Sequence, residues 1–248
     1  MQVIINADDL GMTREVNDAI FALIAGGRIT SSTVMANGFA WEDAALRAKA
    51  FPQCSFGAHL NATQFQPLAV TPGLKPLLDG SGNFSENQLR EVNITRELQA
   101  ALLIEWKAQV MRLCEAGFRI SHFDSHHHVH TIPGVFPVLK QLQRLFNIRK
   151  VRLSRNYYLP ETPVPITRHL AKAVWKFALK NYFKTKTTDG FTSLDVFLKK
   201  ADQININYCI ELQAHPGNIK YQTETQMFGC EWVQKLPFPI KLISYDGL

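Results

Sequence analysis

The sequence lacks the features that would fix it in a membrane or cross-link it. Its 248 residues contain no apolar run of the roughly 18 residues that a membrane-spanning helix needs. The start, MQVIINADDLG, has neither the basic stretch nor the small-residue cleavage site of a signal peptide. No C-x-x-C pair occurs among the four widely spaced cysteines, which are Cys54, Cys114, Cys209 and Cys230. We therefore exclude a zinc ribbon, disfavour a disulfide framework and expect a cytoplasmic protein with reduced thiols.

Several nucleotide-binding and catalytic motifs are also missing. No G-x-G-x-x-G follows a predicted strand and no Walker loop occurs, so the sequence offers no nucleotide-binding turn. No G-x-S-x-G occurs either, and nothing indicates a serine or cysteine nucleophile. An apolar content of 46% and a charged content of 19% are typical of a globular protein.

Negative charge is missing from one segment, and this explains the net charge of +6. Residues 162–188 contain no Asp or Glu but six positive charges, at Arg168, Lys172, Lys176, Lys180, Lys184 and Lys186. The chain has 27 Lys and Arg against 21 Asp and Glu, so the rest of it is neutral, with 21 residues of each sign.

The same segment predicts a basic amphipathic helix over 167–183. Its apolar side consists of Leu170, Val174, Trp175, Phe177, Leu179 and Phe183. Its role stays open between an outer helix with a solvated lysine face and contact, through 167–184, with an anionic membrane surface or a lipid-linked saccharide carrier. We disfavour nucleic acid as a partner, because the patch is one helix without a recognised nucleic-acid fold. A homodimer also stays open.

Short β-rich runs alternate with longer helical patterns along the chain. Strands are expected at 2–7, 30–36, 55–60, 119–125, 150–154, 209–214 and 240–245. Helices are expected at 13–26, 41–50, 95–117, 134–146, 167–183, 193–202 and 223–235. Seven such units predict a parallel sheet with helices outside. We favour a single domain over 1–248, folded as a closed or nearly closed (β/α) barrel, with 66–94 as a surface excursion near the active face.

Polar residues follow the predicted strands, where parallel strands of a barrel converge on one face. They are Asp8 and Asp9, then His59, Asn61 and Thr63, then the stretch HFDSHHHVH, then Arg152 and Arg155, and finally His215. Each residue alone has a structural alternative: the two aspartates could cap a helix that begins near Thr13, and His59 could be a hydrogen-bonded core histidine. Their shared position at strand ends instead favours a functional site.

The stretch HFDSHHHVH, residues 122–130, cannot hold one metal ion with all its side chains. In an extended strand, alternate residues share a side and lie roughly 6.6 Å apart, whereas metal–nitrogen bonds are about 2.0–2.1 Å. One or two histidines can therefore bind an ion, while the others orient ligands or contact substrate. An aspartate and two histidines from separate strands would form a catalytic site for Zn²⁺, Fe²⁺, Mn²⁺ or a similar ion.

The motifs NADDLGMTREVNDAI, RITSSTVMANG, GAHLNAT, HFDSHHHVH and AHPG resemble, in order, those of the YdjC-like carbohydrate deacetylases. That family includes chitooligosaccharide and hopanoid-associated deacetylases. The resemblance implies a distorted (β/α) barrel of about seven parallel strands with outer helices. It also implies a metal-dependent hydrolase that removes the N-acetyl group from an amino sugar or short N-acetylated oligosaccharide, which could be lipid-linked.

The resemblance further implies a role for each matching residue. Asp9, His59 and His126 would bind one divalent metal ion, most plausibly Zn or Mg, with Mn, Co or Ni as alternatives. Asp8 would be the base, His215 the general acid, and Arg152, or else Arg155, would orient the base. Substrate-side or ligand-orienting roles would fall to Asn61, Thr63, Asp124, His128 and His130.

Two further functions stay open. The first is a noncatalytic sugar- or anion-binding protein on the same barrel, although intact metal and base positions argue against it. The second is a metal-dependent hydrolase of another amide or of a phosphoester, which would more often show a carboxylate-rich, two-metal site. Gly190, in TTDGFTSL, stands where many relatives have a histidine, so this chain could accept a different sugar.

Overall fold

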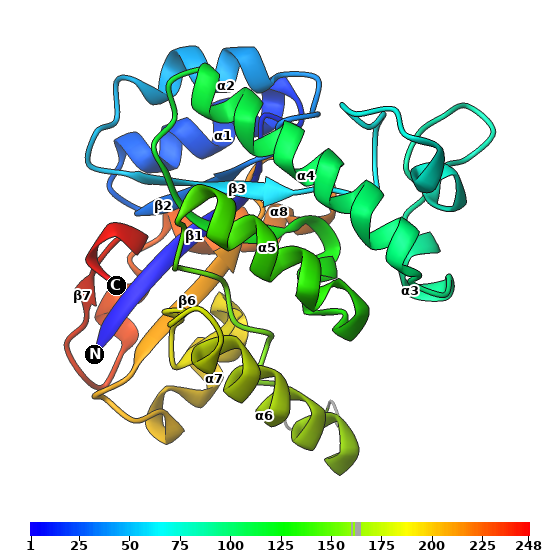
Figure 1. Cartoon of the computed structure of the whole chain (residues 1–248). Coiled ribbons are helices and arrows are strands. Elements are labelled where there is room, and N and C mark those ends of the chain that lie inside the picture. Colours follow the sequence, from blue (N-terminus) through cyan, green and yellow to red (C-terminus); the bar gives the residue numbers. More distant parts are fainter. Residues whose placement is uncertain (160, 162–164) are drawn as a thin grey trace.

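The computed structural model describes residues 1–159, 161 and 165–248 and contains a seven-stranded parallel sheet (Figure 1). The order along the sheet is β4-β3-β2-β1-β6-β5, and β7 pairs with β1. The strands are β1 (Gln2–Leu10), β2 (Ser31–Val34), β3 (Ser55–Leu60), β4 (Ile120–Ser125), β5 (Gly190–Ser193), β6 (Cys209–Ala214) and β7 (Lys241–Leu242). The expected parallel α/β fold is thus confirmed.

Isolated bridges connect the two edges of this sheet. Val151 pairs with Phe123 of β4, and Lys150 pairs with Lys186, which leads into β5. Val151 N donates to Lys186 O at 3.1 Å, and Arg152 N donates to Phe123 O at 2.9 Å. The sheet therefore curls into a nearly closed ring, although the expected strand at 150–154 is reduced to single bridges.

Strand β5 was not among the expected strands, because glycine in TTDGFTSL weakens the strand pattern. At Gly190 a Cβ atom would lie 2.5 Å from both Ile210 Cδ1 and Tyr157 Cε2. A side chain at Gly190 would therefore have to displace the ends of these two side chains. The close approach is a long-range contact that local sequence does not reveal.

Helices surround the sheet and follow most of the expected ranges. They are α1 (Arg14–Ala25), α2 (Trp41–Ala48), α3 (Gln88–Glu91), α4 (Arg96–Glu115), α5 (Phe136–Phe146), α6 (Ile166–Asn181), α7 (Leu194–Lys200) and α8 (Gln222–Gly229). As expected, Thr95 caps α4 by accepting from Leu98 N at 3.2 Å. The expected helix at 223–235 is wrong in length, because α8 stops at Gly229 and a 3₁₀ turn follows at Trp232–Lys235. No helix in the described ranges has the length and apolar character to cross a membrane.

The excursion at 66–94 folds over one end of the barrel, as expected, and contains a 3₁₀ turn at Pro72–Leu77 together with α3. The buried carboxylate of Glu105 on α4 fixes its beginning, accepting from Leu68 N at 3.1 Å and from Ala69 N at 2.6 Å. This anchor orders a loop that would otherwise leave buried backbone donors unpaired.

The expected division of α6 into an apolar side and a solvated lysine side holds only in part, since Leu179 is buried and Lys180 is exposed as expected. Trp175 is buried, but Val174 and Phe177 are 68% and 71% exposed. Lys172 and Lys176 turn inward instead, and their Nζ atoms donate to Arg155 O at 2.5 Å and to Asp189 O at 3.1 Å. The long lysine stems let these ammonium groups reach backbone oxygens on the barrel. Figure 1 shows α6 at the periphery of the molecule.

Candidate active site

A β-bulge at the end of β1 presents two adjacent carboxylates to one cavity. Ala7 pairs with Ser32 and Leu10 pairs with Val34, so Asp8 and Asp9 together oppose a single residue of β2. Asp9 adopts a left-handed backbone with φ of 68°. The alternative that the aspartates cap the next helix is not what the structure shows, because Thr13 caps α1 by accepting from Val16 N at 3.3 Å.

Asp9, His59 and His126 converge from three strand ends, as expected for metal ligands. Asp9 Oδ1 lies 3.2 Å from His59 Nε2 and 2.9 Å from His126 Nδ1. All three side chains are buried, and their donor atoms lie within 4.8 Å of one another. A second group with this spacing, formed by Asp8, His59 and Asp124, is less suited to an ion because both of its carboxylates already contact a guanidinium.

Hydrogen bonds orient both histidines for metal binding. His59 Nδ1 lies 2.8 Å from Asp124 Oδ1, and His126 Nε2 lies 3.0 Å from Gln64 Oε1. In the neutral rings, with those nitrogens donating, the nitrogens that face Asp9 carry lone pairs. Asp9 Oδ1 is buried and accepts no hydrogen bond from any described residue. One oxygen and two lone-pair nitrogens around a buried carboxylate fit a divalent cation such as Zn²⁺.

The pKa values of Asp9 and His59 also favour a cation between these residues. Burial disfavours the charged form of Asp9, but the nearby rings of His126 and His59 hold its pKa well below the ordinary range. Burial likewise lowers the pKa of His59, yet the charge and hydrogen bond of Asp124 outweigh it and raise that pKa to about 10. The pocket therefore stabilises positive charge, which a cation can supply in place of a proton.

Asp8 is held on the other side of the bulge by Arg152. Nη1 and Nη2 of Arg152 donate to the two oxygens of Asp8 at 2.7 Å and 2.6 Å, and Asn6 Nδ2 donates to Asp8 Oδ1 at 3.0 Å. Such a bidentate pair fixes the plane of the carboxylate. Of the two arginines that the sequence offered, Arg152 is the one that contacts Asp8, while Arg155 lines the cavity.

Arg152 serves three buried carboxylates in all. Besides Asp8, it contacts Asp124 Oδ2 at 2.6 Å and Glu211 Oε1 at 2.8 Å. The far oxygen of Glu211 accepts from the Tyr245 hydroxyl at 2.6 Å. Burial raises the pKa of Glu211 to about 7 despite the arginine. Glu211 was not expected in the site, because its neighbours in sequence are those of an ordinary buried strand.

His215 follows β6 and faces Asp8 across the cavity. Its Nε2 lies 3.8 Å from Asp8 Oδ2, and its ring stacks on Tyr221 with 4.3 Å between centroids. On the opposite edge, Nδ1 lies 3.3 Å from Glu224 Oε1, which also accepts from the His215 backbone N–H. Burial lowers the pKa of His215, but the Glu224 hydrogen bond and the Asp8 charge outweigh it and leave the pKa raised. A protonated imidazole with one free N–H suits a general acid.

The histidine stretch departs from the expected alternation after Ser125. There β4 ends, and His126–Thr131 forms a tight turn in which His127 and His128 have positive φ. His122 points to the barrel interior and stacks on Tyr245 with 3.5 Å between centroids, away from the metal ligands. The prediction that the five alternate residues of 122–130 share one side is therefore wrong beyond the strand.

Four residues expected on the substrate side lie behind the cavity wall instead. Asn61, Thr63, Asp124 and His130 are at most 2% exposed and none lines the cavity. Their polar atoms are already engaged: Asn61 binds backbone and side-chain groups, Thr63 binds Asn61, Asp124 binds His59, and His130 binds Ser125. We therefore assign them to support of the site, whereas His128 does line the cavity.

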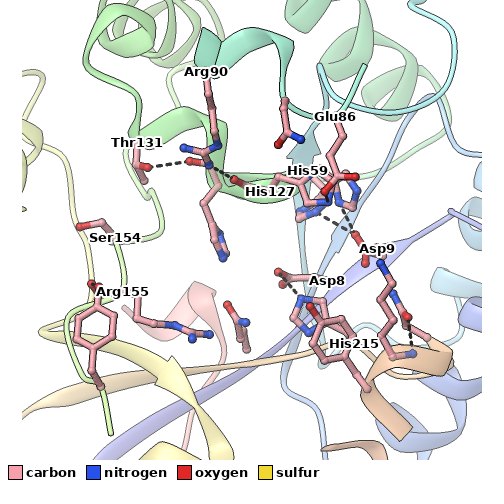
Figure 2. A pocket seen from close by; sticks show the side chains of 18 of the residues that line it. Asp8, Asp9, His59, Glu86, Arg90, His127, Thr131, Ser154, Arg155 and His215 are labelled. Atoms are coloured by element: carbon pink, nitrogen blue, oxygen red, sulfur yellow. Dashed lines mark hydrogen bonds and ion pairs between the residues drawn. The ribbon is translucent and has the colours of Figure 1, made fainter. Parts of the chain in front are cut away.

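A cavity of about 580 Å³ opens above the ligands (Figure 2). Asp8, Asp9 and His215 line it, and Figure 2 shows Asp8 directed toward His215 and Asp9 directed toward His59. Glu86 and Arg90, from the excursion at 66–94, line one wall, and Arg155 projects from the opposite side. This volume accommodates a sugar-sized ligand.

The fold and these residues define a class, namely a (β/α) barrel with a candidate Asp-His-His metal site beside a carboxylate and a histidine. The chain belongs to the YdjC-like protein family, whose model matches residues 2–235. It is similar to the carbohydrate deacetylase of Geobacillus stearothermophilus, with 34% identity over 87% of this chain and 79% of that protein. A carbohydrate deacetylase of Vibrio cholerae shows 35% identity over 88% and 79%.

A solved structure shares the whole fold. It is a candidate cellobiose-phosphate cleavage protein from Enterococcus faecalis V583, which superposes with a TM-score of 0.76 over 99% of this chain and 98% of that chain. Its sequence identity is 23%, so the likeness bears on the fold alone.

Proposed function

We propose that this protein is a metal-dependent carbohydrate deacetylase that hydrolyses the N-acetyl group of an amino sugar or a short N-acetylated oligosaccharide. The observation that carries the proposal is the arrangement of Asp9, His59 and His126 next to Asp8 and His215. The similarity to proteins named carbohydrate deacetylases supports the same substrate class.

Different side chains of the site would carry out different steps of the hydrolysis. A divalent cation held by Asp9, His59 and His126 would supply Lewis-acid activation of water and of the acetyl carbonyl. Asp8, fixed by Arg152, is placed to accept the water proton. His215 Nε2 then donates a proton to the departing amine, and Glu224 holds the ring for that transfer. The products are acetate and a free amino sugar.

Zinc is the metal that the donor set favours. Two nitrogens and one carboxylate oxygen suit Zn²⁺ or Fe²⁺ better than Mg²⁺, which prefers oxygen ligands. The same set is poor in carboxylates, which disfavours a two-metal phosphoesterase as the alternative hydrolase. Metal analysis of the purified protein would test this preference for Zn²⁺ over Mg²⁺, and preferential retention of Mg²⁺ would contradict it.

We also propose that the protein contacts a membrane through the outer face of α6. Leu170, Val174 and Phe177 are exposed there, Arg168 and Lys180 lie nearby on the same exposed helix, and residues 162–188 contain no acidic side chain. An apolar stripe flanked by positive charge fits an anionic bilayer, which could present a lipid-linked sugar. Cosedimentation with phosphatidylglycerol vesicles should fall when Val174 and Phe177 are both changed to Asp; equal sedimentation of both proteins would contradict the contact.

Acetate release is the decisive assay for the proposed activity. Metal-reconstituted protein is incubated with N-acetylated mono-, di- and lipid-linked sugars, and acetate is measured. Asp8→Asn should abolish release and keep metal content near that of the wild type, because Asp8 is outside the favoured ligand group. The matched control, Asp202→Asn, changes an exposed aspartate and should behave like the wild type. Release by Asp8→Asn at the wild-type rate would remove Asp8 as the base, and no release from any sugar would favour a binding protein.

A further inference from the structure

The C-terminal segment, residues 241–248, lies against the end of the barrel opposite the cavity. β7 pairs with Gln2 and Val3 at the start of β1, whereas the two aspartates at the end of that strand line the cavity. Figure 1 shows the C-terminus beside the start of β1. The match to the family model ends at residue 235, so this segment lies outside the part of the chain that the family model describes.

Tyr245 anchors this segment and reaches into the barrel. Its backbone N–H donates at 3.0 Å to the hydroxyls of both Ser31 and Ser55, and its carbonyl oxygen accepts from Lys150 Nζ at 2.6 Å. The side chain is fully buried, and its ring stacks on His122 with an interplanar angle of 8°. A fixed backbone and a stacked ring determine the direction in which the phenol hydroxyl points.

The Tyr245 hydroxyl begins a chain of hydrogen bonds that ends at Asp8. It donates to Glu211 Oε2 at 2.6 Å. The other oxygen of Glu211 accepts from Arg152 Nε at 2.8 Å and lies 2.8 Å from Nη2. The two terminal nitrogens of Arg152 donate in turn to the oxygens of Asp8. All four side chains are at most 2% exposed, and hydrogen bonds in such a buried network strengthen one another.

The orientation of the guanidinium depends on how each of its partners is held. Asp8, Asp124 and Glu211 share one planar group, and Glu211 holds its Nε edge. Without the hydroxyl of Tyr245, Glu211 Oε2 would lose its hydrogen bond in a buried position. The same hydrogen bond favours the charged form of Glu211, because it lowers the pKa that burial raises to about 7. A charged and fixed Glu211 therefore sets the plane that the guanidinium presents to Asp8.

We propose that Tyr245 is a positioning residue for the hydrolysis, which holds the Asp8 carboxylate in the orientation that proton transfer requires. Its hydroxyl acts through Glu211 and Arg152, and Tyr245 itself does not line the cavity. This inference rests on the proposed deacetylase function and adds the C-terminal segment to its machinery.

The test is Tyr245→Phe, which keeps the ring and removes only the hydroxyl. Acetate release by zinc-reconstituted protein is measured with N-acetylglucosamine and N,N′-diacetylchitobiose, and kcat is separated from KM. A shift of about 1 Å at a reacting group can cost about 100-fold in rate, so a partial loss of orientation should lower kcat about 5- to 50-fold. KM should stay within about twofold, because the hydroxyl lies away from the cavity. Metal content should equal that of the wild type.

A double-variant cycle tests the route through Glu211. Glu211→Met keeps a side chain of similar length and removes both acceptor oxygens, so adding Tyr245→Phe in that background should change kcat by less than about twofold. The full loss of kcat in both backgrounds would overturn the relay, because the hydroxyl would then act without Glu211. Glu211→Met by itself should also lower kcat with KM unchanged. Wild-type kcat in that variant would overturn the relay even if Tyr245→Phe did not fold.

The controls separate this inference from the proposed function. Tyr208→Phe removes the hydroxyl of an exposed tyrosine and should match the wild type. Circular dichroism at the assay temperature verifies that each variant is folded. Wild-type kcat in folded Tyr245→Phe, or a loss that appears in KM instead of kcat, would overturn the positioning role and leave the deacetylase intact. No acetate from the wild type with any N-acetylated sugar would overturn the deacetylase itself, and the positioning role with it.

Discussion

Replacement of Arg152 by Met should destabilise the protein severely, because one buried guanidinium serves three carboxylates. Its nitrogens lie 2.6 Å from Asp8, 2.6 Å from Asp124 and 2.8 Å from Glu211, and none of these side chains is more than 3% exposed. Removing one partner from a buried ion pair costs about 3–5 kcal/mol, because the remaining charge is left without compensation. Several orphaned carboxylates place Arg152→Met at the upper end of that range. This is a large part of the ~5–15 kcal/mol that stabilises a typical domain.

The sign of the pH dependence separates this cause from a simple loss of packing. Without Arg152, the folded-state pKa values of Asp124 and Glu211 rise, since the guanidinium no longer offsets their burial. A raised folded pKa stabilises the folded state at low pH and costs stability as pH rises. The deficit of Arg152→Met should therefore be smaller at pH 5 than at pH 7.5, whereas a packing defect would be nearly independent of pH.

Urea denaturation of metal-free protein at both pH values is the assay. Arg152→Lys controls for charge, and the double variant Arg152→Met with Glu211→Gln should recover about 0.5–3 kcal/mol, because one orphaned carboxylate is removed. A deficit below about 1 kcal/mol at pH 7.5, or an equal deficit at both pH values, would refute the reasoning. If Arg152→Met does not fold, the same comparison is made with the double variant, which still leaves Asp8 and Asp124 without the guanidinium.

Three further predictions concern single contacts. Glu224→Gln should move the alkaline limb of the kcat/KM profile to lower pH, because Glu224 raises the pKa of His215 and the general acid must be protonated; an unmoved limb would contradict the pairing. Gln64→Leu should weaken metal affinity about 10–100-fold by removing the hydrogen bond to His126, as measured by competition with a chelator. Glu211→Gln should reduce the loss of stability between pH 5 and pH 8, because the Glu211 pKa of about 7 makes the wild type weaken as pH rises above the unfolded-state value. Parallel stability curves for the two proteins in urea would speak against the last of these.

The parallel architecture and the placement of polar residues at strand ends were predictable from sequence because they follow local rules, whereas the choice of Asp9, His59 and His126 among those residues came from the family resemblance. Buried strands read as short apolar runs, and polar side chains at their ends converge on one face of a barrel. Asp9, His59 and His126 each lie at such an end, so their approach follows from topology. The order of the strands then brings them together without further information.

Residues that support the site were harder to predict. Glu224 reaches His215 from α8, and Gln64 reaches His126 from the loop after β3, so both depend on loop conformations. The two faces of α6 were likewise assigned incorrectly in part, because lysines at helical spacing normally face solvent, whereas here Lys172 and Lys176 reach backbone oxygens. Such contacts depend on tertiary packing that overrides the local pattern.

The bulge in β1 resolves how adjacent aspartates can serve one cavity. In a regular strand, successive side chains point to opposite faces, so one of Asp8 and Asp9 would be directed toward the outer helices. In the bulge, Asp8 and Asp9 together lie opposite a single residue of β2, and Asp9 has a left-handed backbone. This arrangement turns the Asp9 carboxylate back to the same side as that of Asp8. Aspartate tolerates that backbone better than most residues, so the chemical role and the conformation favour the same side chain. The five histidines of the 122–130 stretch supply only one candidate ligand, and the geometry of the site depends at least as much on this irregularity in β1, which lies in the middle of the sheet.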